Sequence, residues 1–179
     1  NNITQHNRNP LLGRDESIDG VKTGHTEAAG YCLVGSAKRD GLRIVATVMG
    51  TEGARYRAEA VYSLLKYGFA AYEMHRVYRA GAAVVNVVPV YKGDRSSVAV
   101  GVSQDVQLIL PKGAGAGLEA SVIVNEPLIA PLDQQQQVGK LILGLGGKEI
   151  GAYPLVTLDA INQGSWTSRM LDVIRLRFR

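Results

Sequence analysis

The sequence predicts an α+β fold that continues into an all-β region and ends in a short helix. Helical spacing of apolar residues is confined to residues 54–73 and 165–179. Short alternating apolar runs, separated by turn signals, fill most of the chain between residues 83 and 158. We therefore expect three parts, which cover residues 1–76, 77–163 and 164–179.

The first part should contain two buried strands and a helix. Residues 1–20 are polar, and the apolar runs 31–37 and 42–50 are joined by a hairpin turn at Asp40-Gly41. Because both runs are mostly apolar, we expect cover on both faces of their sheet. Residues 54–73 should pack on that sheet as a helix. Its apolar positions are Ala54, Ala58, Val61, Leu64, Leu65 and Phe69, with the charged residues Arg55, Arg57, Glu59 and Lys66 between them.

The second part reads as an all-β, sandwich-like domain or a small barrel, because short strands follow one another at even spacing. The character of the sequence changes after Tyr72, so we place the boundary near residue 76. The expected strands cover residues 83–91, 97–102, 106–110, 120–124, 140–145 and 155–158.

Composition limits the classes of partner. Of the 179 residues, 46% are apolar and 20% are charged, which is the balance of a globular protein. The net charge of +4 is mild and dispersed along the chain, so it does not predict binding to nucleic acid. It is compatible with a partner that has an anionic surface, such as a membrane or the cell wall. The single cysteine, Cys32, reads as a small core residue, and the three histidines are scattered. We therefore expect neither a metal nor a cofactor.

The third part has the pattern of an in-plane membrane anchor. On a helical wheel that starts at Trp166, one side is apolar and the other is polar. Four arginines against one aspartate favour an anionic bilayer surface, and fifteen residues are too few to cross it. A helix folded back on the β region is the alternative. The apolar side contains Trp166, Met170, Val173, Ile174, Leu176 and Phe178 with Leu171 at its border, Ser168, Asp172, Arg175 and Arg179 lie opposite, and Arg169 and Arg177 intrude on the apolar side.

Lys22-Thr23-Gly24 is the stretch that indicates chemistry. A lysine supplies positive charge to a substrate carboxylate, a threonine hydroxyl donates a hydrogen bond, and a glycine lets a strand edge approach the substrate. The edge of such a strand can also pair with an extended peptide. Three common residues are weak evidence alone, so the context decides.

The context resembles the serine-type D-alanyl-D-alanine carboxypeptidases, the low-molecular-mass penicillin-binding proteins of the 5/6 type. The resemblance lies in Asp19–Thr26 followed by Ala29-Gly30-Tyr31, and it covers nearly the whole chain. It implies that residues 1–76 are the C-terminal portion of a β-lactamase/transpeptidase-like α/β catalytic domain. Similar stretches are Gln5–Asn9, Val48-Met49-Gly50 and Leu64–Phe69.

The resemblance also implies roles for individual residues. Lys22 and Thr23 would hold the substrate carboxylate and help proton transfer, and Gly24 would allow close approach. The backbone N–H of His25 would supply half of the oxyanion hole. Arg8 would add positive charge near the carboxylate, or would form a structural ion pair instead.

The family's partners and location follow from the same resemblance. The substrate would be a peptidoglycan pentapeptide ending in D-Ala-D-Ala, and β-lactams would acylate the same serine. The enzyme would be periplasmic and peripherally attached to the outer face of the inner (cytoplasmic) membrane through residues 164–179. It would need no cofactor.

Two motifs of that family are missing from their expected place. Both the Ser-x-x-Lys and the Ser-x-Asn motifs should precede Lys22, and only 21 residues do so. The one Ser-x-x-Lys match, at Ser63–Lys66, lies in the packing helix. We therefore expect the chain to lack the nucleophile, to be inactive alone, and to be a fragment whose missing N-terminal part is its partner.

Two other functions remain open. The β-rich region could be a stalk or interaction module without activity of its own. The chain could also belong to a hydrolase resembling the class A β-lactamases, which share the Lys-Thr-Gly strand, although the added β region and the basic tail argue against that.

Overall fold

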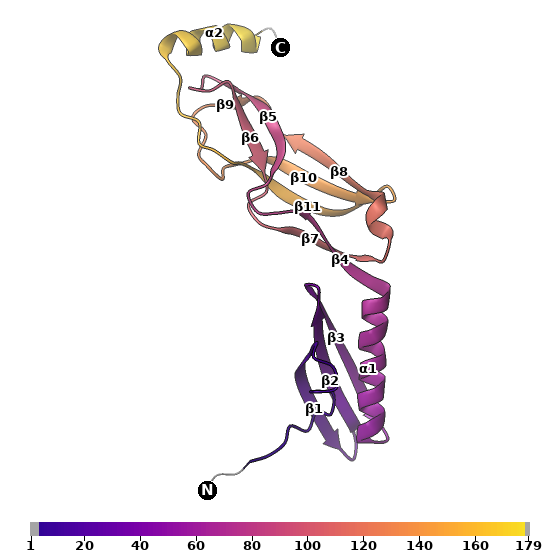
Figure 1. Ribbon diagram of the computed structural model, residues 1–179. Helices are drawn as coiled ribbons and strands as arrows, with labels where there is room; N and C mark the ends of the chain where they lie inside the picture. Colours follow the sequence, from indigo (N-terminus) through magenta and orange to yellow (C-terminus); the bar gives the residue numbers. More distant parts are fainter. Residues whose placement is uncertain (1–3, 178–179) are drawn as a thin grey trace. The chain divides into compact units, whose positions relative to one another are not determined.

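The computed structural model describes residues 4–177, and it is mostly β with two helices. Figure 1 shows the order of the elements along the chain. The chain divides into two compact units. One unit extends to Met74 and includes Ile109–Gly113, and the other contains His75–Leu108 and the chain from Ala114 onward.

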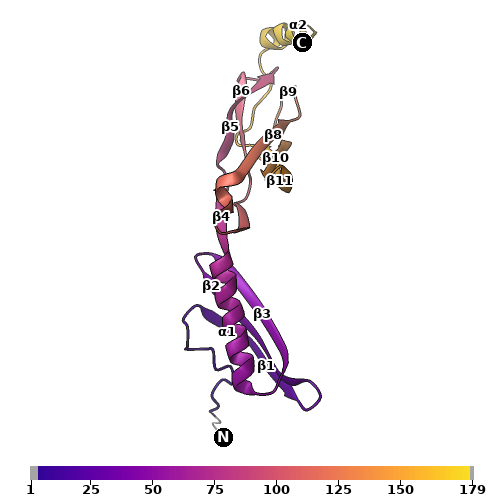
Figure 2. The same ribbon diagram turned by 90° about the vertical axis from the view of Figure 1, so that its right-hand side faces the viewer.

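The first unit is a three-stranded antiparallel sheet with one helix against it (Figures 1 and 2). The strand order is β1-β2-β3, so β1 is an edge strand. The strand pair and helix expected from the sequence are present, and β1 adds the Lys-Thr-Gly segment to the sheet. The bounds are β1 Ile18–Thr26, β2 Gly30–Arg39, β3 Leu42–Thr51 and α1 Ala54–Ala71.

Helix α1 approaches the sheet closely at two glycines. A Cβ on Gly35 of β2 would lie 2.4 Å from Val61 Cγ1, and a Cβ on Gly68 of α1 would lie 2.3 Å from Ile44 Cδ1. Both distances are far below van der Waals contact, so a side chain at either position would force Val61 or Ile44 to shift. The core between helix and sheet comprises Leu11, Ile18, Leu33, Ala37, Ala46, Ala58, Val61 and Leu65.

Cover on both faces of this sheet was expected, and the described chain covers one. Ala46 of β3 packs in the core, whereas Val45 and Met49, one and three residues away along the strand, are 58% and 73% exposed. Successive side chains of a strand point to opposite faces, so the face away from α1 is open in residues 4–177. The single helix covers only one face, so the second covering layer that the apolar strands predicted is absent from residues 4–177.

Two positions of α1 differ from the simple reading of its spacing. Leu64 is 47% exposed, although it was grouped with the apolar stripe. Arg57 was placed among the charged residues between the apolar positions, and it is buried at 7% exposure. Arg57, Val61 and Leu65 are four residues apart, so they share one helical face, which points to the sheet.

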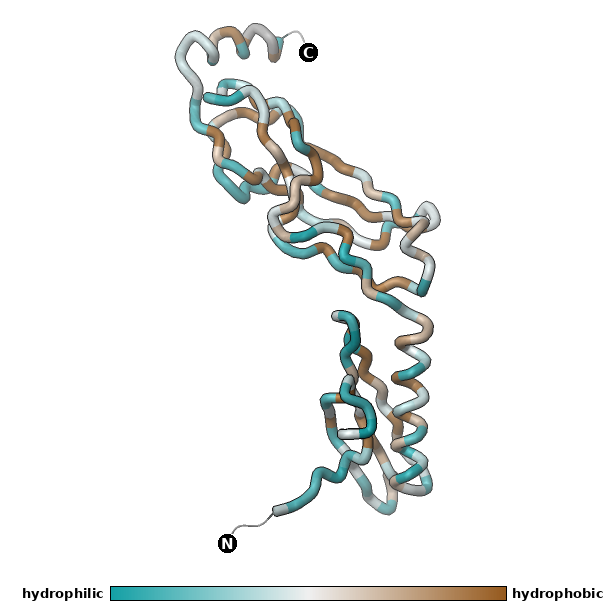
Figure 3. The backbone as a smooth tube through the Cα atoms, viewed as in Figure 1, coloured by the Kyte–Doolittle hydropathy of each residue, from teal (hydrophilic) through white to brown (hydrophobic). Residues whose placement is uncertain are grey.

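The second unit contains a six-stranded sheet in the order β8-β10-β11-β6-β5-β9 and contributes to the β4–β7 ribbon. Figure 3 shows apolar stretches along its strands, with more polar positions between them. All expected strands are present, and the spacing missed β4 and the two-residue β9. The bounds are β4 Tyr72–Tyr78, β5 Ala83–Tyr91, β6 Ser97–Gly101, β7 Val106–Pro111, η1 Ala114–Gly117, β8 Leu118–Val124, β9 Leu128–Ile129, β10 Gln137–Leu145, β11 Lys148–Thr157 and α2 Trp166–Arg177.

The core of the second unit draws on both groups of strands. Leu141, Leu143 and Leu155 of the large sheet are fully buried. Val106 of the ribbon belongs to the same core, and Val77 packs against it. The ribbon therefore covers part of the sheet, so this unit has a hydrophobic interior of its own.

Candidate functional site

The Lys-Thr-Gly segment lies on β1, whose other edge pairs with no strand among the described residues. Lys22, Gly24 and His25 are exposed, and Thr23 is half-buried. In the register of the sheet, Thr23 lies opposite Leu33 and Gly24 opposite Cys32. The structure thus presents all four residues on one accessible strand.

The Lys22 side chain lies on the exposed part of this strand. Its Nζ donates a hydrogen bond to the Thr23 carbonyl oxygen at 2.6 Å. The side chain is exposed, so the ammonium group is accessible to an anion. A lysine in this state is a flexible point charge with two further donors.

Gly24 is not required by the packing of the chain itself. A Cβ there would meet only Cys32 Cβ, at an ordinary 3.8 Å, and the residue does not adopt the left-handed conformation. A methyl group at this position would therefore fill the space beside the strand without disturbing the packing of the chain.

The His25 side chain stacks on its cross-strand neighbour. Its ring lies 3.9 Å from the Tyr31 ring, between centroids, at an interplanar angle of 37°. This contact involves only the imidazole ring of His25, and the backbone N–H takes no part in it. Cys32 next to Tyr31 is only half-buried, rather than a full core residue, and its thiol donates to the Ala29 carbonyl at 3.4 Å.

Arg57 reaches the same strand from α1. Its Nη1 donates to the Gly24 carbonyl oxygen at 2.7 Å and to the Cys32 carbonyl oxygen at 3.1 Å. Its guanidinium carbon also lies 5.4 Å from the Tyr31 ring centroid. Sequence reasoning did not select this residue, although its spacing from Val61 and Leu65 could have placed it on the buried face.

Arg8 and its neighbour Asn9 differ in their surroundings. Arg8 is exposed, and no hydrogen bond or ion pair joins it to Lys22 or Thr23 among residues 4–177. Asn9 is buried, its Nδ2 donates to the Gly20 carbonyl at 3.3 Å, and its Oδ1 accepts from the Leu11 N–H at 3.1 Å. The loop that carries Arg8 is therefore fastened beside β1 by Asn9, which the sequence analysis did not identify as important.

A polar chain crosses the sheet at the start of β1. Arg43 of β3 donates to both oxygens of Asp19, at 2.8 and 2.7 Å, and to Ser36 Oγ of β2. The hydrogen bond from Arg43, followed by that from Ser36, lowers the pKa of Asp19 to about 2. The contact ties the first residues of β1 to the two other strands.

Ser63 and Lys66, the one Ser-x-x-Lys match, are both exposed on α1. Lys66 Nζ lies 5.6 Å from the Tyr62 ring centroid on the same helix. Neither residue lies on β1.

The second unit has a distinct surface at α2. Asp172 is only 8% exposed, and its Oδ2 accepts a hydrogen bond from the Lys92 backbone N–H at 2.7 Å. The Lys92 carbonyl accepts from the Gly164 N–H at 2.8 Å, so the loop after β5 holds both the helix and the segment that leads into it. Ser165 Oγ accepts from the Ser168 N–H at 3.3 Å and caps the first turn.

This polar docking turns apolar side chains outward. Trp166 is 75% exposed, and Met170, Leu171 and Val173 are also exposed. Trp166, Met170 and Val173 line a shallow depression together with Lys92 and Arg169. Leu176 and Ser168 are half-buried and Arg177 is exposed, whereas Phe178, Arg179 and the side chains of Ile174 and Arg175 lie outside the described residues.

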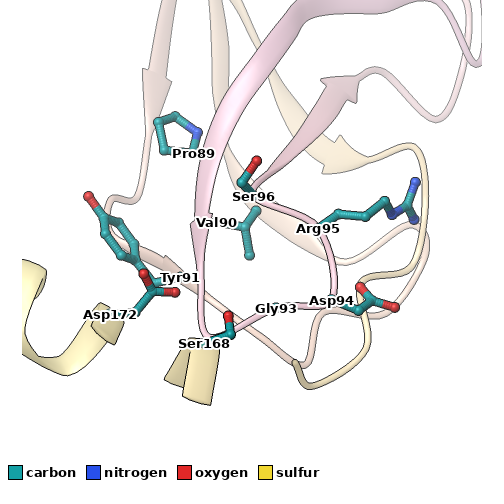
Figure 4. A pocket seen from close by; sticks show the side chains of 9 residues that line it. All are labelled: Pro89, Val90, Tyr91, Gly93, Asp94, Arg95, Ser96, Ser168 and Asp172. Atoms are coloured by element: carbon teal, nitrogen blue, oxygen red, sulfur yellow. The ribbon is translucent and has the colours of Figure 1, made fainter. Parts of the chain in front are cut away.

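A pocket of about 500 Å³ follows the seam between β5 and α2. Figure 4 shows Ser168 and Asp172 on the helix, with Asp94 and Arg95 on the loop that follows β5. The lining mixes both signs of charge, and Asp172 already accepts from Lys92. The pocket therefore lies along the contact between α2 and the loop after β5, and its mixed charges do not indicate one class of ligand.

The described residues form neither a metal-binding cluster nor a membrane-spanning helix. Within residues 4–177, no three His, Cys, Asp or Glu side chains lie close enough together to bind a metal ion. Neither helix of that part of the chain is long and apolar enough to span a bilayer.

Comparison with known proteins gives two family matches. Residues 72–163 match the penicillin-binding protein 5 C-terminal domain, and residues 1–53 match the D-alanyl-D-alanine carboxypeptidase family, peptidase S11. The curated relatives include the D-alanyl-D-alanine carboxypeptidase DacA of Escherichia coli, which is 38% identical over 99% of this chain and 44% of that protein. DacF of Bacillus subtilis is 28% identical over 89% of this chain and 41% of that protein.

Solved structures agree with these matches. Penicillin-binding protein 5 from Haemophilus influenzae superposes with a TM-score of 0.77 at 35% identity, over 90% of this chain and 47% of that one. DacD from Francisella tularensis gives 0.61 at 36% identity, over 89% and 40%. The chain thus spans a little under half the length of these relatives. It belongs to the penicillin-binding protein 5 family of D-alanyl-D-alanine carboxypeptidases and corresponds to their C-terminal part.

Proposed function

We propose that this chain supplies the substrate-carboxylate side of the active site of a serine-type D-alanyl-D-alanine carboxypeptidase. The observation that carries the proposal is the open edge of β1, on which Lys22, Thr23, Gly24 and His25 are all accessible. Residues 1–76 would be the C-terminal portion of the catalytic domain. A serine from a part of the protein outside this chain would attack the D-Ala–D-Ala peptide bond.

Each residue of the segment has a task in that reaction. The Lys22 ammonium and the Thr23 hydroxyl would bind the terminal carboxylate of the pentapeptide, and Lys22 would also assist proton transfer. The substrate backbone would pair with the free edge of β1, which Gly24 keeps clear. Arg8, on the loop fastened by Asn9, would add positive charge near the carboxylate.

The His25 backbone N–H would donate to the oxyanion that forms when the serine attacks the carbonyl. One such donor contributes ~3 kcal/mol of transition-state stabilisation. The tetrahedral adduct would then collapse with cleavage of the peptide C–N bond, so that D-alanine leaves as the protonated amine and the serine remains as an acyl ester. Water would hydrolyse that acyl-enzyme and free the serine. β-Lactams would acylate the same serine, and this chain alone would be inactive because it lacks the nucleophile.

The match of residues 72–163 to the penicillin-binding protein 5 C-terminal domain favours this function over that of a class A β-lactamase. In the proposal, residues 77–163 form a stalk or interaction module, and the protein acts in the periplasm on peptidoglycan. The β unit itself would have no activity.

Substitution of Lys22 in the full-length protein tests the site. Lys22→Ala should slow both acylation by a fluorescent penicillin and release of D-alanine. The reason is that a desolvated carboxylate that loses its charged partner loses ~2–5 kcal/mol of interaction free energy. Gly24→Ala should retain the fold, because its Cβ meets only ordinary contacts, and yet slow acylation by about tenfold or more. Lys38→Ala, at an exposed lysine near the end of β2, is the matched control. Normal acylation of a folded Lys22→Ala protein would remove Lys22 from the site.

We also propose that residues 164–179 bind the outer face of the cytoplasmic membrane. The support is the direction in which α2 faces, since Asp172 is buried and Trp166, Met170 and Val173 are exposed beside Lys92 and Arg169. An apolar surface flanked by tryptophan and cations suits the interface of an anionic bilayer.

Co-sedimentation with vesicles of phosphatidylglycerol and phosphatidylethanolamine tests the anchor. Deletion from residue 165 onward should abolish binding by the full-length protein, and a Trp166→Ser/Met170→Ser double substitution should weaken it without loss of folding. Raising the salt concentration should weaken binding through the basic residues. Equal sedimentation of the intact and truncated proteins would refute the anchor, and binding that ignores salt would exclude the arginine contribution.

A further inference from the structure

Arg57 is a buried cation that lies directly behind the Lys-Thr-Gly strand. Its Nη1 has two carbonyl acceptors, and its Nε is a buried nitrogen without a hydrogen-bond partner among the described residues. Burying a charged group with an unused donor destabilises a fold, and an apolar side chain of the same size is often as good or better for stability. The stability of the core therefore does not explain why a guanidinium occupies this position.

The bond from Arg57 fixes the direction of one peptide group. The two oxygens that Nη1 contacts belong to Gly24 of β1 and Cys32 of β2, so the Gly24 carbonyl points to the β2 side of its strand. The Gly24–His25 peptide bond is trans, and in a planar trans peptide the C=O and the following N–H point in opposite directions. The His25 N–H therefore points to the free edge of β1, away from Arg57.

We infer that Arg57 is a positioning residue for the oxyanion hole: by holding the Gly24 carbonyl, it orients the His25 N–H toward the reacting carbonyl of the substrate. The inference rests on the function proposed above, in which His25 N–H is an oxyanion donor. The Tyr31 ring reinforces the arrangement, because it lies against both the Arg57 guanidinium and the His25 ring. Arg57 itself does not need to touch the substrate.

Such a role has a distinctive kinetic signature. A donor that is misaligned loses stabilisation of the tetrahedral oxyanion but not of the bound substrate, so kcat should fall and KM should change little. Affinity for a peptide boronic acid, whose tetrahedral adduct with the serine places an oxygen in the oxyanion position, should fall with kcat. A purely structural role would instead lower the melting temperature and every form of binding together.

The test uses the full-length protein with Arg57→Met, which keeps the volume and removes the donors. We expect penicillin acylation, kcat and boronate affinity to fall about 10- to 100-fold, with KM and the melting temperature little changed. Arg57→Lys, which restores a donor without the rigid planar fork, should give intermediate values. Arg55→Met is the matched control on the same helix, because Arg55 is exposed, and it should retain the parent rates.

Several outcomes would overturn the inference. A folded Arg57→Met protein with parent-like acylation would do so, and so would a loss confined to KM, which would indicate a substrate contact. If Arg57→Met fails to fold, Arg57→Lys decides, and acylation within about twofold of the parent then refutes the positioning role. A parent protein that neither binds penicillin covalently nor releases D-alanine contradicts the proposed function instead, so the two failures are distinguishable.

Discussion

The first unit buries one face of a three-stranded sheet beneath a single helix, whereas the second builds an interior from two groups of strands. Among the described residues, the first core has eight buried apolar residues and the second has fourteen, so the larger unit has much more area with which to offset the entropy of folding. The first unit also leaves a sheet face and an edge strand open. The proposed active site lies on that open edge. The strand that would bind the substrate and the uncovered face of the sheet therefore belong to the same unit.

The strongest way to break this comparison is to separate the units. Residues 72–163 keep β4 whole, so this piece should be soluble and monomeric and should unfold cooperatively on heating or in urea. Residues 1–71 should aggregate, because an apolar face and a strand edge would both meet solvent. Size-exclusion chromatography and urea titration measure both expectations. A monomeric first piece with a cooperative transition would show that one helix suffices to complete it.

A substitution at Gly35 sharpens the comparison within the first core. A Cβ at this position would lie 2.4 Å from Val61, which is fully buried, so the helix must shift to accept it. Gly35→Ala should therefore lower the free energy of unfolding of the first unit by about 1–3 kcal/mol. The measurement is denaturation of the full-length protein followed by a probe in that unit.

Gly117→Ala is a suitable control for that experiment. Its Cβ would lie at an ordinary 3.5 Å from Leu145 in the second unit. Stability changes of the same size at both positions would argue against close helix approach as the cause.

The smallest expected effect concerns acid. The pKa of Asp19 is lowered to about 2 from a usual 3.8, first by the Arg43 hydrogen bond, so the bond stabilises the folded state fully above about pH 4. That contribution is lost as the pH falls through 4 toward 2, because the unfolded chain then binds the proton more readily. Both groups are about half exposed, so the effect should be small and weakened by salt.

Asp19→Asn should flatten the dependence of stability on pH in this window. Arg43→Ala should do the same, and the double substitution should add nothing further. Additive losses from the two single substitutions would show that Asp19 and Arg43 act independently.

The sequence predicted the elements of the chain well and their surroundings less well. Alternation located β5, helical spacing located α1, and two apolar runs joined by a hairpin turn located β2–β3, because these patterns follow directly from backbone geometry. The short β9 and the ribbon strand β4 depend on pairing with distant strands, which no local pattern reports. Cover on the second face of the sheet is a tertiary property, so the pattern alone could not locate it.

The candidate site shows the same limit. The accessibility of Lys22 and Thr23 on an edge strand agrees with what the motif requires, and the roles of these residues stay proposals. Arg57 and Asn9 act through hydrogen bonds to backbone carbonyls, at Gly24 and at Gly20. Every residue has a backbone carbonyl, so the sequence does not show which one accepts a hydrogen bond. Neither contact could therefore be predicted from residue types.

The polar docking of α2 has a consequence for how the chain can vary. The helix is held by a buried carboxylate against the Lys92 amide, while Trp166 and Met170 take no part in that contact. The contact that holds the helix and the apolar side chains that would bind a membrane surface thus belong to different residues of one helix. In the proposed anchor, substitutions among the exposed apolar residues would change the affinity for a bilayer while the second unit folds as before.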